Sequence, residues 1–150
     1  MEYLSTRDKT LRLTAAEAIK MGLSRDGGLF TPAEFPGLSP LEIEALCPMT
    51  YQQRAAYIME KFLPDFTPEE LTEYAEKAYG PDKFDTDHAA PLRRVGGKTW
   101  CLELWHGPTS AFKDMALQML PQLLSASLRK TGEEKTACIR FFIFIPPFIH

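Results

Sequence analysis

Residues 102–118 read Leu-Glu-Leu-Trp-His-Gly-Pro-Thr-Ser-Ala-Phe-Lys-Asp-Met-Ala-Leu-Gln and contain a sharp change of pattern. Alternating apolar and polar residues up to Trp105 predict a strand, and Gly107-Pro108 predicts a turn. A helical pattern follows, with apolar residues at Ala116, Met119, Leu120, Leu123 and Leu124. The stretch therefore predicts a strand–turn–helix unit, with Lys113 near the start of the helix.

Lys113 stands where a helix normally favours an acidic residue, because the positive end of the helix dipole lies there. Asp114 compensates part of that charge. If Lys113 also packs among Phe112, Trp105 and the helix, loss of water favours its neutral amine, the form that makes a Schiff base with an aldehyde. The alternative is an exposed lysine on the first turn of a helix, and spacing alone favours that alternative.

The segments on either side of this stretch predict a hairpin and an interrupted helix. Residues 92–95 and 99–105 flank Gly96-Gly97, a pattern typical of a β-hairpin. Pro121 falls within the helical pattern after Lys113, where it removes a backbone hydrogen bond to Leu117. We therefore expect the helix to kink or break near Pro121.

The first eighty residues carry four helix-start signals, each a Ser or Thr followed three residues later by Glu or Gln. This spacing lets the two residues cap each other's backbone N–H groups. Glycines or prolines close the four helical patterns. Residues 1–80 therefore predict a compact helical domain, with starts at Thr14/Glu17, Ser39/Glu42, Thr50/Gln53 and Thr67/Glu70.

Two loops contain residues that could form ligand sites. Asp26-Gly27-Gly28 requires a positive φ and predicts a tight turn into a short extended piece, because no strand and helix flank it as in a phosphate loop. Residues 81–91 are polar and bounded by prolines, so they predict the boundary with a second unit over 81–139. His88 in this loop lacks a second ligand at metal-binding spacing, so no metal site is predicted.

Composition is that of an ordinary globular protein. With 17 Lys and Arg against 20 Asp and Glu, the chain has no basic excess for a nucleic acid partner. No apolar run is long enough to span a membrane, and the N-terminus lacks a secretory pattern. We expect a cytoplasmic protein whose three cysteines, Cys47, Cys101 and Cys138, are reduced and mostly buried.

Three segments together resemble the threonine synthase family. Residues 102–114 are similar to its lysine segment, L-E-L-F/W-H-G-P-T-x-A-F-K-D. Near the N-terminus, residues 3–7 resemble Y-x-S-T-R and residues 26–32 resemble D-G-G-L-F-x-P. The resemblance runs in order from about Tyr3 to Ile139 and is far more specific than a single short motif.

The resemblance implies a fold-type-II pyridoxal 5'-phosphate (PLP) lyase that converts O-phospho-L-homoserine and water to L-threonine and phosphate. Lys113 would hold the cofactor and move protons, with Phe112 against the ring. His106 and Thr109 would help to shape the pocket, or would simply pack the turn. The segment Ser5, Thr6 and Arg7 would contribute to the phosphate side of the substrate, or would only be structure near the start of a helix.

The implied fold class is α/β, or α+β for this part alone: a helical domain, a hairpin and the first elements of a parallel sheet. Residues 135–139 predict a core strand. Residues 140–150 then lack the glycine, serine and threonine that the family carries after this strand. We interpret this apolar tail as anomalous and expect an inactive fragment of a longer, interrupted gene product.

The sequence is also compatible with two other functions. The first is a catalytically silent structural or interaction module. The second is a threonine-synthase-like phospholyase that acts on a related phosphorylated small molecule. Oligomeric state is not predicted.

Overall fold

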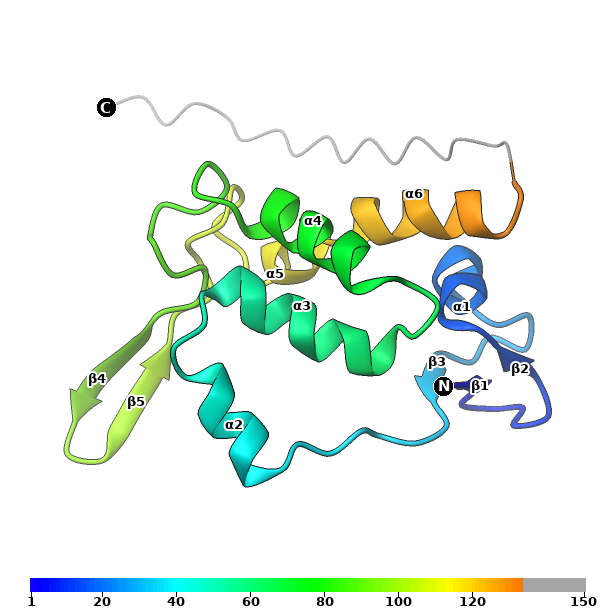
Figure 1. Cartoon of the computed structure of the whole chain (residues 1–150), viewed down its shortest axis with the longest axis horizontal. Helices are drawn as coiled ribbons and strands as arrows, with labels where there is room; N and C mark the ends of the chain where they lie inside the picture. The colour runs from blue at the N-terminus through cyan, green and yellow to red at the C-terminus, as the bar shows by residue number, and fades with distance from the viewer. Residues whose placement is uncertain (134–150) are drawn as a thin grey trace.

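The computed structural model describes residues 1–133 as a mixed α/β structure (Figure 1). The strands are β1 (Tyr3–Ser5), β2 (Arg12–Leu13), β3 (Phe30–Pro32), β4 (Leu92–Gly96) and β5 (Thr99–Leu102). The helices are α1 (Ala15–Met21), α2 (Pro40–Leu46), α3 (Tyr51–Phe62), α4 (Pro68–Tyr79), α5 (Asp114–Leu117) and α6 (Leu120–Lys130).

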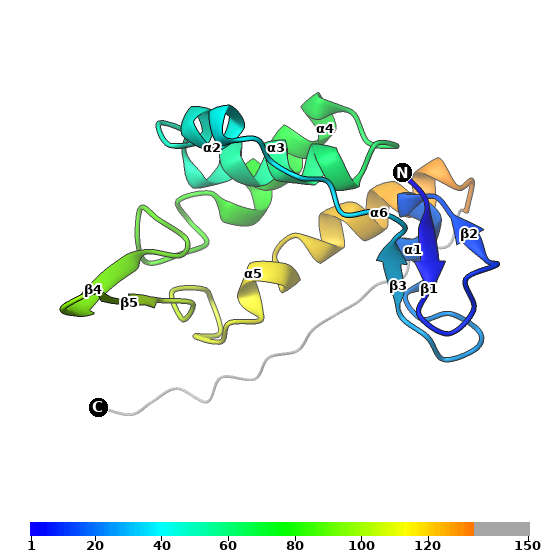
Figure 2. The ribbon, with the colours of Figure 1, turned by 90° about the horizontal axis from the view of Figure 1, so that it is seen from below.

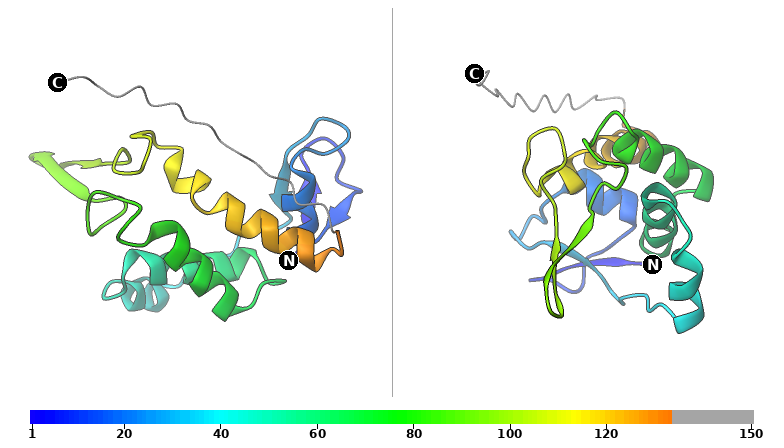
Figure 3. Two further views of the ribbon diagram at one scale, coloured as in Figure 1. Left: turned by 90° about the horizontal axis from the view of Figure 1, so that it is seen from above. Right: turned by 90° about the vertical axis from the view of Figure 1, so that its left-hand side faces the viewer.

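Helices form the middle of the described structure. Helices α3 and α4 lie side by side and run in opposite directions, and α6 packs along α1 and α4. Figures 2 and 3 show the small sheet of β1, β2 and β3 at one end and the β4–β5 hairpin projecting from the other end. The predicted boundary near residue 80 stays a prediction.

All four predicted helix starts are confirmed. Thr14, Ser39, Thr50 and Thr67 each accept a hydrogen bond from the backbone three residues later, and each box is closed by the reciprocal Glu or Gln. Gly22 caps the end of α1, as its position predicts. Local sequence therefore sets where these helices begin.

Removing one capping residue tests how much a capping box contributes to the stability of the fold. The Glu70 N–H donates to Thr67 Oγ1 at 3.2 Å, and the Thr67 N–H donates to a Glu70 carboxylate oxygen at 2.9 Å. Thr67→Ala is expected to lower the free energy of unfolding by about 1 kcal/mol, measured by urea denaturation. Thr72→Ala, which removes an exposed hydroxyl inside α4, is the matched control and is expected to have a smaller effect. Equal losses in the two variants would contradict a specific role for the cap.

The N-terminal region is not purely helical, which corrects the sequence prediction. Strand β1 pairs antiparallel with both β2 and β3, in the order β2-β1-β3. These strands have only two or three residues each, so the alternation that reveals a strand in a sequence is too short to recognise. Only the extended piece after Gly28 was predicted.

The core lies around α4 and includes residues from both ends of the described chain. Leu71 and Ala75 are completely buried, and Met119 and Ala126 complete the same apolar cluster. Pro121 stands in the first turn of α6, and α5 ends before it, at Leu117. The predicted break is confirmed, and it separates a short α5 from an α6 that closes the core.

The predicted hairpin is confirmed but shorter than expected. Strands β4 and β5 pair antiparallel, with Leu92 opposite Leu102, so β5 ends before Trp105. Apolar side chains of the hairpin, such as Val95 and Trp100, are exposed. The strand predicted at 135–139, the tail and the parallel sheet that they would begin or follow lie outside the described residues. None of the helices within residues 1–133 has the length and apolar character to span a bilayer.

Candidate active site around Lys113

Lys113 lies immediately before α5, at the predicted junction. Its side chain is exposed, as are those of Phe112 at 66 % and Trp105 at 49 %. The packed, desolvated lysine considered from the sequence is therefore not found. The reason is that no described element covers this face of α5, which leaves the amine in contact with water.

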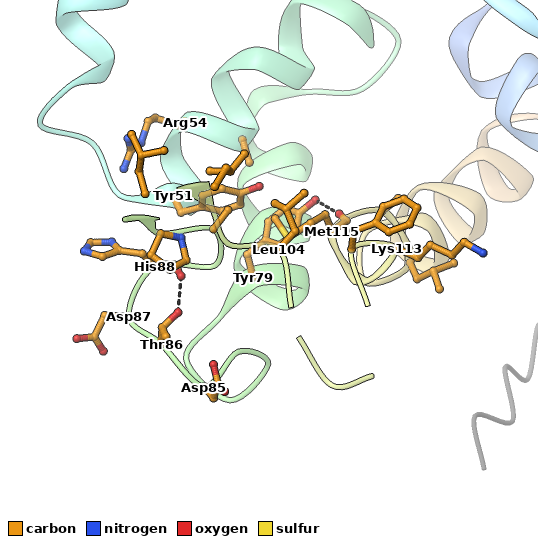
Figure 4. Close-up of a pocket in the computed structure, with 18 of the residues that line it drawn as sticks. Tyr51, Arg54, Tyr79, Asp85, Thr86, Asp87, His88, Leu104, Lys113 and Met115 are labelled. Atoms are coloured by element: carbon orange, nitrogen blue, oxygen red, sulfur yellow. Dashed lines mark hydrogen bonds between the residues drawn. The ribbon is translucent and has the colours of Figure 1, made fainter. Parts of the chain in front are cut away.

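Lys113 lines an open cleft of about 1350 Å³ between α3, the 85–91 loop, the hairpin and α5. Figure 4 shows Lys113 at the α5 end of the cleft, with Asp85, Thr86 and His88 at the other end. The wall is largely apolar and aromatic, with Tyr51, Ile58, Met59, Tyr79, Leu92, Leu102, Leu104, Phe112 and Met115 among its lining residues.

The wall of the cleft is attached to the helical core through Tyr79. Its hydroxyl donates to the Met115 carbonyl oxygen at 2.7 Å, which ties α5 to the end of α4 (Figure 4). Burial raises the pKa of Tyr79 well above its ordinary value, so this hydroxyl stays protonated and keeps its role as a donor. The position of α5 is therefore set by the core and not by the loop alone.

Asp114 organises the loop that carries Lys113. Its carboxylate is completely buried, and one oxygen accepts the Thr109 N–H at 2.8 Å and the Thr109 hydroxyl at 2.9 Å. Gly107 passes so close that an added Cβ would lie 2.5 Å from Asp114 Cβ. Ser110 has φ +55°, a conformation that non-glycine residues rarely adopt. The sequence predicts only partial charge compensation for Asp114, and its hydrogen bonds to Thr109 are visible only in the structure.

His106 joins the boundary loop to the end of the hairpin. Its Nδ1 lies 2.6 Å from Asp85 Oδ1 and its Nε2 lies 2.9 Å from Glu103 Oε2. The Asp85 N–H also donates to the His106 carbonyl oxygen at 3.0 Å. The hydrogen bond to Glu103, together with Asp85, raises the pKa of His106 above its ordinary value. The proximity of these two carboxylates in the fold was not visible in the sequence.

This arrangement predicts a pH dependence of stability. Because the folded pKa of His106 is raised, its contribution is complete below the unfolded value near 6.5 and is lost as pH rises through the folded value. The difference in urea midpoint between the wild type and His106→Asn is therefore expected to shrink as pH rises from about 6 to about 9. His88→Asn, a change at an exposed histidine, is the control. If the difference in urea midpoint stayed constant with pH, it would contradict a stabilising contribution of the ion pairs of His106.

Ser5, Thr6 and Arg7 lie against the 24–29 turn and are absent from the residues that line the cleft. Buried Ser5 donates to the Asp26 carboxylate at 2.9 Å, and Arg7 Nη1 donates to the Asp26 carbonyl oxygen at 3.0 Å. Gly27 has the positive φ predicted for this turn, +76°. These contacts favour the structural alternative, and a role at the substrate phosphate stays a prediction.

The remaining polar candidates do not form a metal site in the part of the chain that the structure describes. His88 is exposed, and no three His, Cys, Asp or Glu side chains of residues 1–133 cluster as ligands. Cys47 is exposed, which corrects the expectation of mostly buried thiols, because it follows the short surface helix α2. Cys101 is half-buried and Cys138 lies outside the described residues.

Comparison with known proteins decides the family. Residues 2–79 match the family described as the threonine synthase N terminus. The chain belongs to the threonine synthase family. The family assignment made from the motifs is therefore confirmed, and with it membership of a family of PLP-dependent lyases.

Individual threonine synthases match a longer part of the chain. Threonine synthase from Pseudomonas aeruginosa is 39% identical over 134 residues, which cover 89% of this chain and 28% of that protein. Human threonine synthase-like 1 is 42% identical over 113 residues, 73% of this chain and 15% of its own length. The chain thus spans about 28% of the threonine synthase that it matches.

The fold agrees with the same family. The crystal structure of PLP-bound threonine synthase from Brucella melitensis superposes with a TM-score of 0.82 at 35% identity, over 89% of this chain and 28% of that one. Threonine synthase from yeast gives a TM-score of 0.77 at 32% identity, over 87% of this chain and 27% of that one. Residues 1–133 therefore have the mixed α/β arrangement of the threonine synthase N-terminal region.

Proposed function

We propose that this chain supplies the lysine that holds PLP in a threonine synthase, the enzyme that converts O-phospho-L-homoserine and water to L-threonine and phosphate. The observation that carries the proposal is Lys113, an exposed lysine among the residues that line a large cleft, within the segment that resembles the family's lysine segment. The Brucella melitensis relative is described as PLP-bound, which supports the same cofactor here.

The residues of the cleft fit this cofactor. PLP needs a primary amine for covalent attachment and an apolar surface for its ring, and the cleft offers Lys113 and Phe112. Its volume of about 1350 Å³ exceeds that of a typical small-molecule site. When bound, PLP supplies an electron sink for a carbanion formed on the substrate.

The side chains of the chain have distinct tasks in this proposal. Lys113 tethers the cofactor and, once its amine is free, takes a proton from the substrate carbon and returns it. Phe112 presents an apolar face to the ring. His106 and Thr109 act on the shape of the cleft through their bonds to Asp85 and Asp114. Arg7 does not line the cleft, so a contact of its guanidinium with the substrate phosphate stays a separate prediction that rests on the affinity of such groups for phosphate.

Reductive trapping tests the proposal without requiring turnover. The purified chain is incubated with PLP, reduced with borohydride and digested, and the labelled lysines are identified by mass spectrometry. We expect label at Lys113 to exceed label at Lys98, an exposed lysine in the hairpin turn, by roughly tenfold, because the cleft raises the local concentration of the cofactor. Equal label at the two lysines would contradict the proposal and would favour a silent structural module.

The second candidate is a threonine-synthase-like phospholyase that acts on a related phosphorylated small molecule, and the chain is also similar to a human protein named threonine synthase-like 1. Phosphate release from O-phospho-L-homoserine and from other small phosphorylated molecules distinguishes the two. Release from O-phospho-L-homoserine alone would favour threonine synthase. Release from another phosphorylated molecule, but not from O-phospho-L-homoserine, would favour the second candidate.

A further inference from the structure

The loop between Gly107 and Asp114 is closed on itself by a single buried carboxylate. Asp114 Oδ2 accepts two hydrogen bonds from Thr109, so it joins the first residue of α5 to a residue that precedes Lys113 by four positions. The Ser110 N–H donates to the Gly107 carbonyl oxygen at 3.0 Å and the Asp114 N–H donates to that of Ala111 at 3.0 Å. Lys113 therefore lies directly before the residue whose carboxylate closes this loop.

The hydrogen bonding of this loop differs from that of an ordinary helix cap. Lys113 occupies the cap position of α5 and its side chain makes no capping bond there. Asp114 instead bonds backwards across the loop, and its other oxygen, Oδ1, is buried with no hydrogen-bond partner among the described residues. A buried carboxylate with one oxygen unpaired is costly. The unpaired oxygen therefore offsets part of the stability that the two hydrogen bonds from Thr109 provide.

The rest of the loop is shaped around the same carboxylate. Only glycine fits at position 107, because a Cβ there would lie 2.6 Å from Asp114 Oδ2. Ser110 takes a positive φ, a strained conformation that persists only where surrounding contacts hold it. Helix α5 has four residues and is too short to stand without such contacts. Asp114 supplies these contacts at the point where the exposed Lys113 leaves the backbone.

We infer that Asp114 is a positioning residue for the Lys113 amine: through Thr109 it locks the 107–114 loop and so presents the amine to a PLP-like aldehyde in one orientation. The inference rests on the proposed function of Lys113. It assigns to Asp114 no contact with substrate or cofactor. Its effect is carried by the two hydrogen bonds to Thr109 and by the close approach of Gly107.

The test measures the ratio of PLP trapped at Lys113 to PLP trapped at Lys98 in the same sample. Asp114→Ala is expected to lower this ratio roughly tenfold, because a misplaced amine reacts slowly with a bound aldehyde. Thr109→Val, which loses the hydroxyl bond but keeps the backbone bond, is expected to lower it by a few fold. Thr109→Ser keeps both bonds and is expected to restore most of the ratio.

A destabilised control separates positioning from general loosening. Ala75→Gly weakens α4 in the core, away from the loop, and is expected to lower the melting temperature while leaving the Lys113 to Lys98 ratio unchanged. If Asp114→Ala does not fold, the comparison of Thr109→Val with Thr109→Ser decides the matter.

The outcomes distinguish the inference from the proposed function. A wild-type chain without preference for Lys113 would overturn the proposed function, and the inference with it. A clear wild-type preference that Thr109→Val and Asp114→Ala leave intact would overturn the inference alone. A loss of preference in Ala75→Gly as large as that in Thr109→Val would also overturn it, because general loosening would then explain both.

Discussion

Lys113→Ala is expected to abolish PLP trapping at the cleft and to reduce any threonine-forming turnover by roughly 10²–10⁴-fold or more, because the chain loses its proposed tether and its proton carrier. The exposed Lys113 side chain makes no core contact, so the thermal unfolding temperature is expected to stay at the wild-type value. The measurement combines borohydride trapping, mass mapping and a thermal melt on the same preparation.

Lys98→Ala is the matched control for this variant. Lys98 is also exposed, but it lies in the hairpin turn outside the residues that line the cleft. Its removal is expected to leave trapping at Lys113 unchanged. Trapping that falls equally in the two variants, or that persists in Lys113→Ala at wild-type levels on another lysine, would contradict the assigned role.

Leu71→Ala is expected to lower the free energy of unfolding by roughly 2–5 kcal/mol, a large fraction of the stability of a domain of this size. Leu71 is 0 % exposed and lies in the core cluster with Ala75, Met119 and Ala126. Truncation removes apolar contacts and leaves a cavity that α4 and α6 cannot fill completely. Urea denaturation followed by circular dichroism measures the loss.

The same substitution at the surface provides the control. Leu41 of α2 is 77 % exposed, so Leu41→Ala is expected to change the free energy of unfolding by no more than about 0.5 kcal/mol. A loss for Leu71→Ala that is no greater than the loss for Leu41→Ala would show that the cluster around α4 is not the core that stabilises the chain.

Helix starts were predictable because their causes are local. A capping residue and its reciprocal acid or amide lie three positions apart, so the whole interaction lies within four consecutive residues. The break at Pro121 has the same local origin, since the missing N–H and the ring clash belong to one residue. The three-stranded sheet of β1, β2 and β3 was missed because its pairing joins segments up to about thirty positions apart through very short strands.

The candidate site was also predictable only where its features depend on neighbouring residues in the sequence. The sequence predicts Lys113 near a strand-to-helix junction, and the resemblance of its segment to a family motif implies its role. The partners of His106 were not predictable, because Asp85 comes from a loop more than twenty residues earlier and only the fold brings it within 2.6 Å. The role of Asp114 was also missed, since charge compensation of a neighbouring lysine explains an acid at that position equally well.

By itself, the sequence determined the family, the four capped helices, the hairpin and the lysine, because each rests on contiguous residues or on motifs in a fixed order. Only the tertiary structure decided that α6 closes the core against α1 and α4, that Lys113 is exposed, and that Asp114 is buried against Thr109. The physical reason is that burial depends on which distant segments cover a residue. Residue type and local spacing do not show which distant segments will cover a residue.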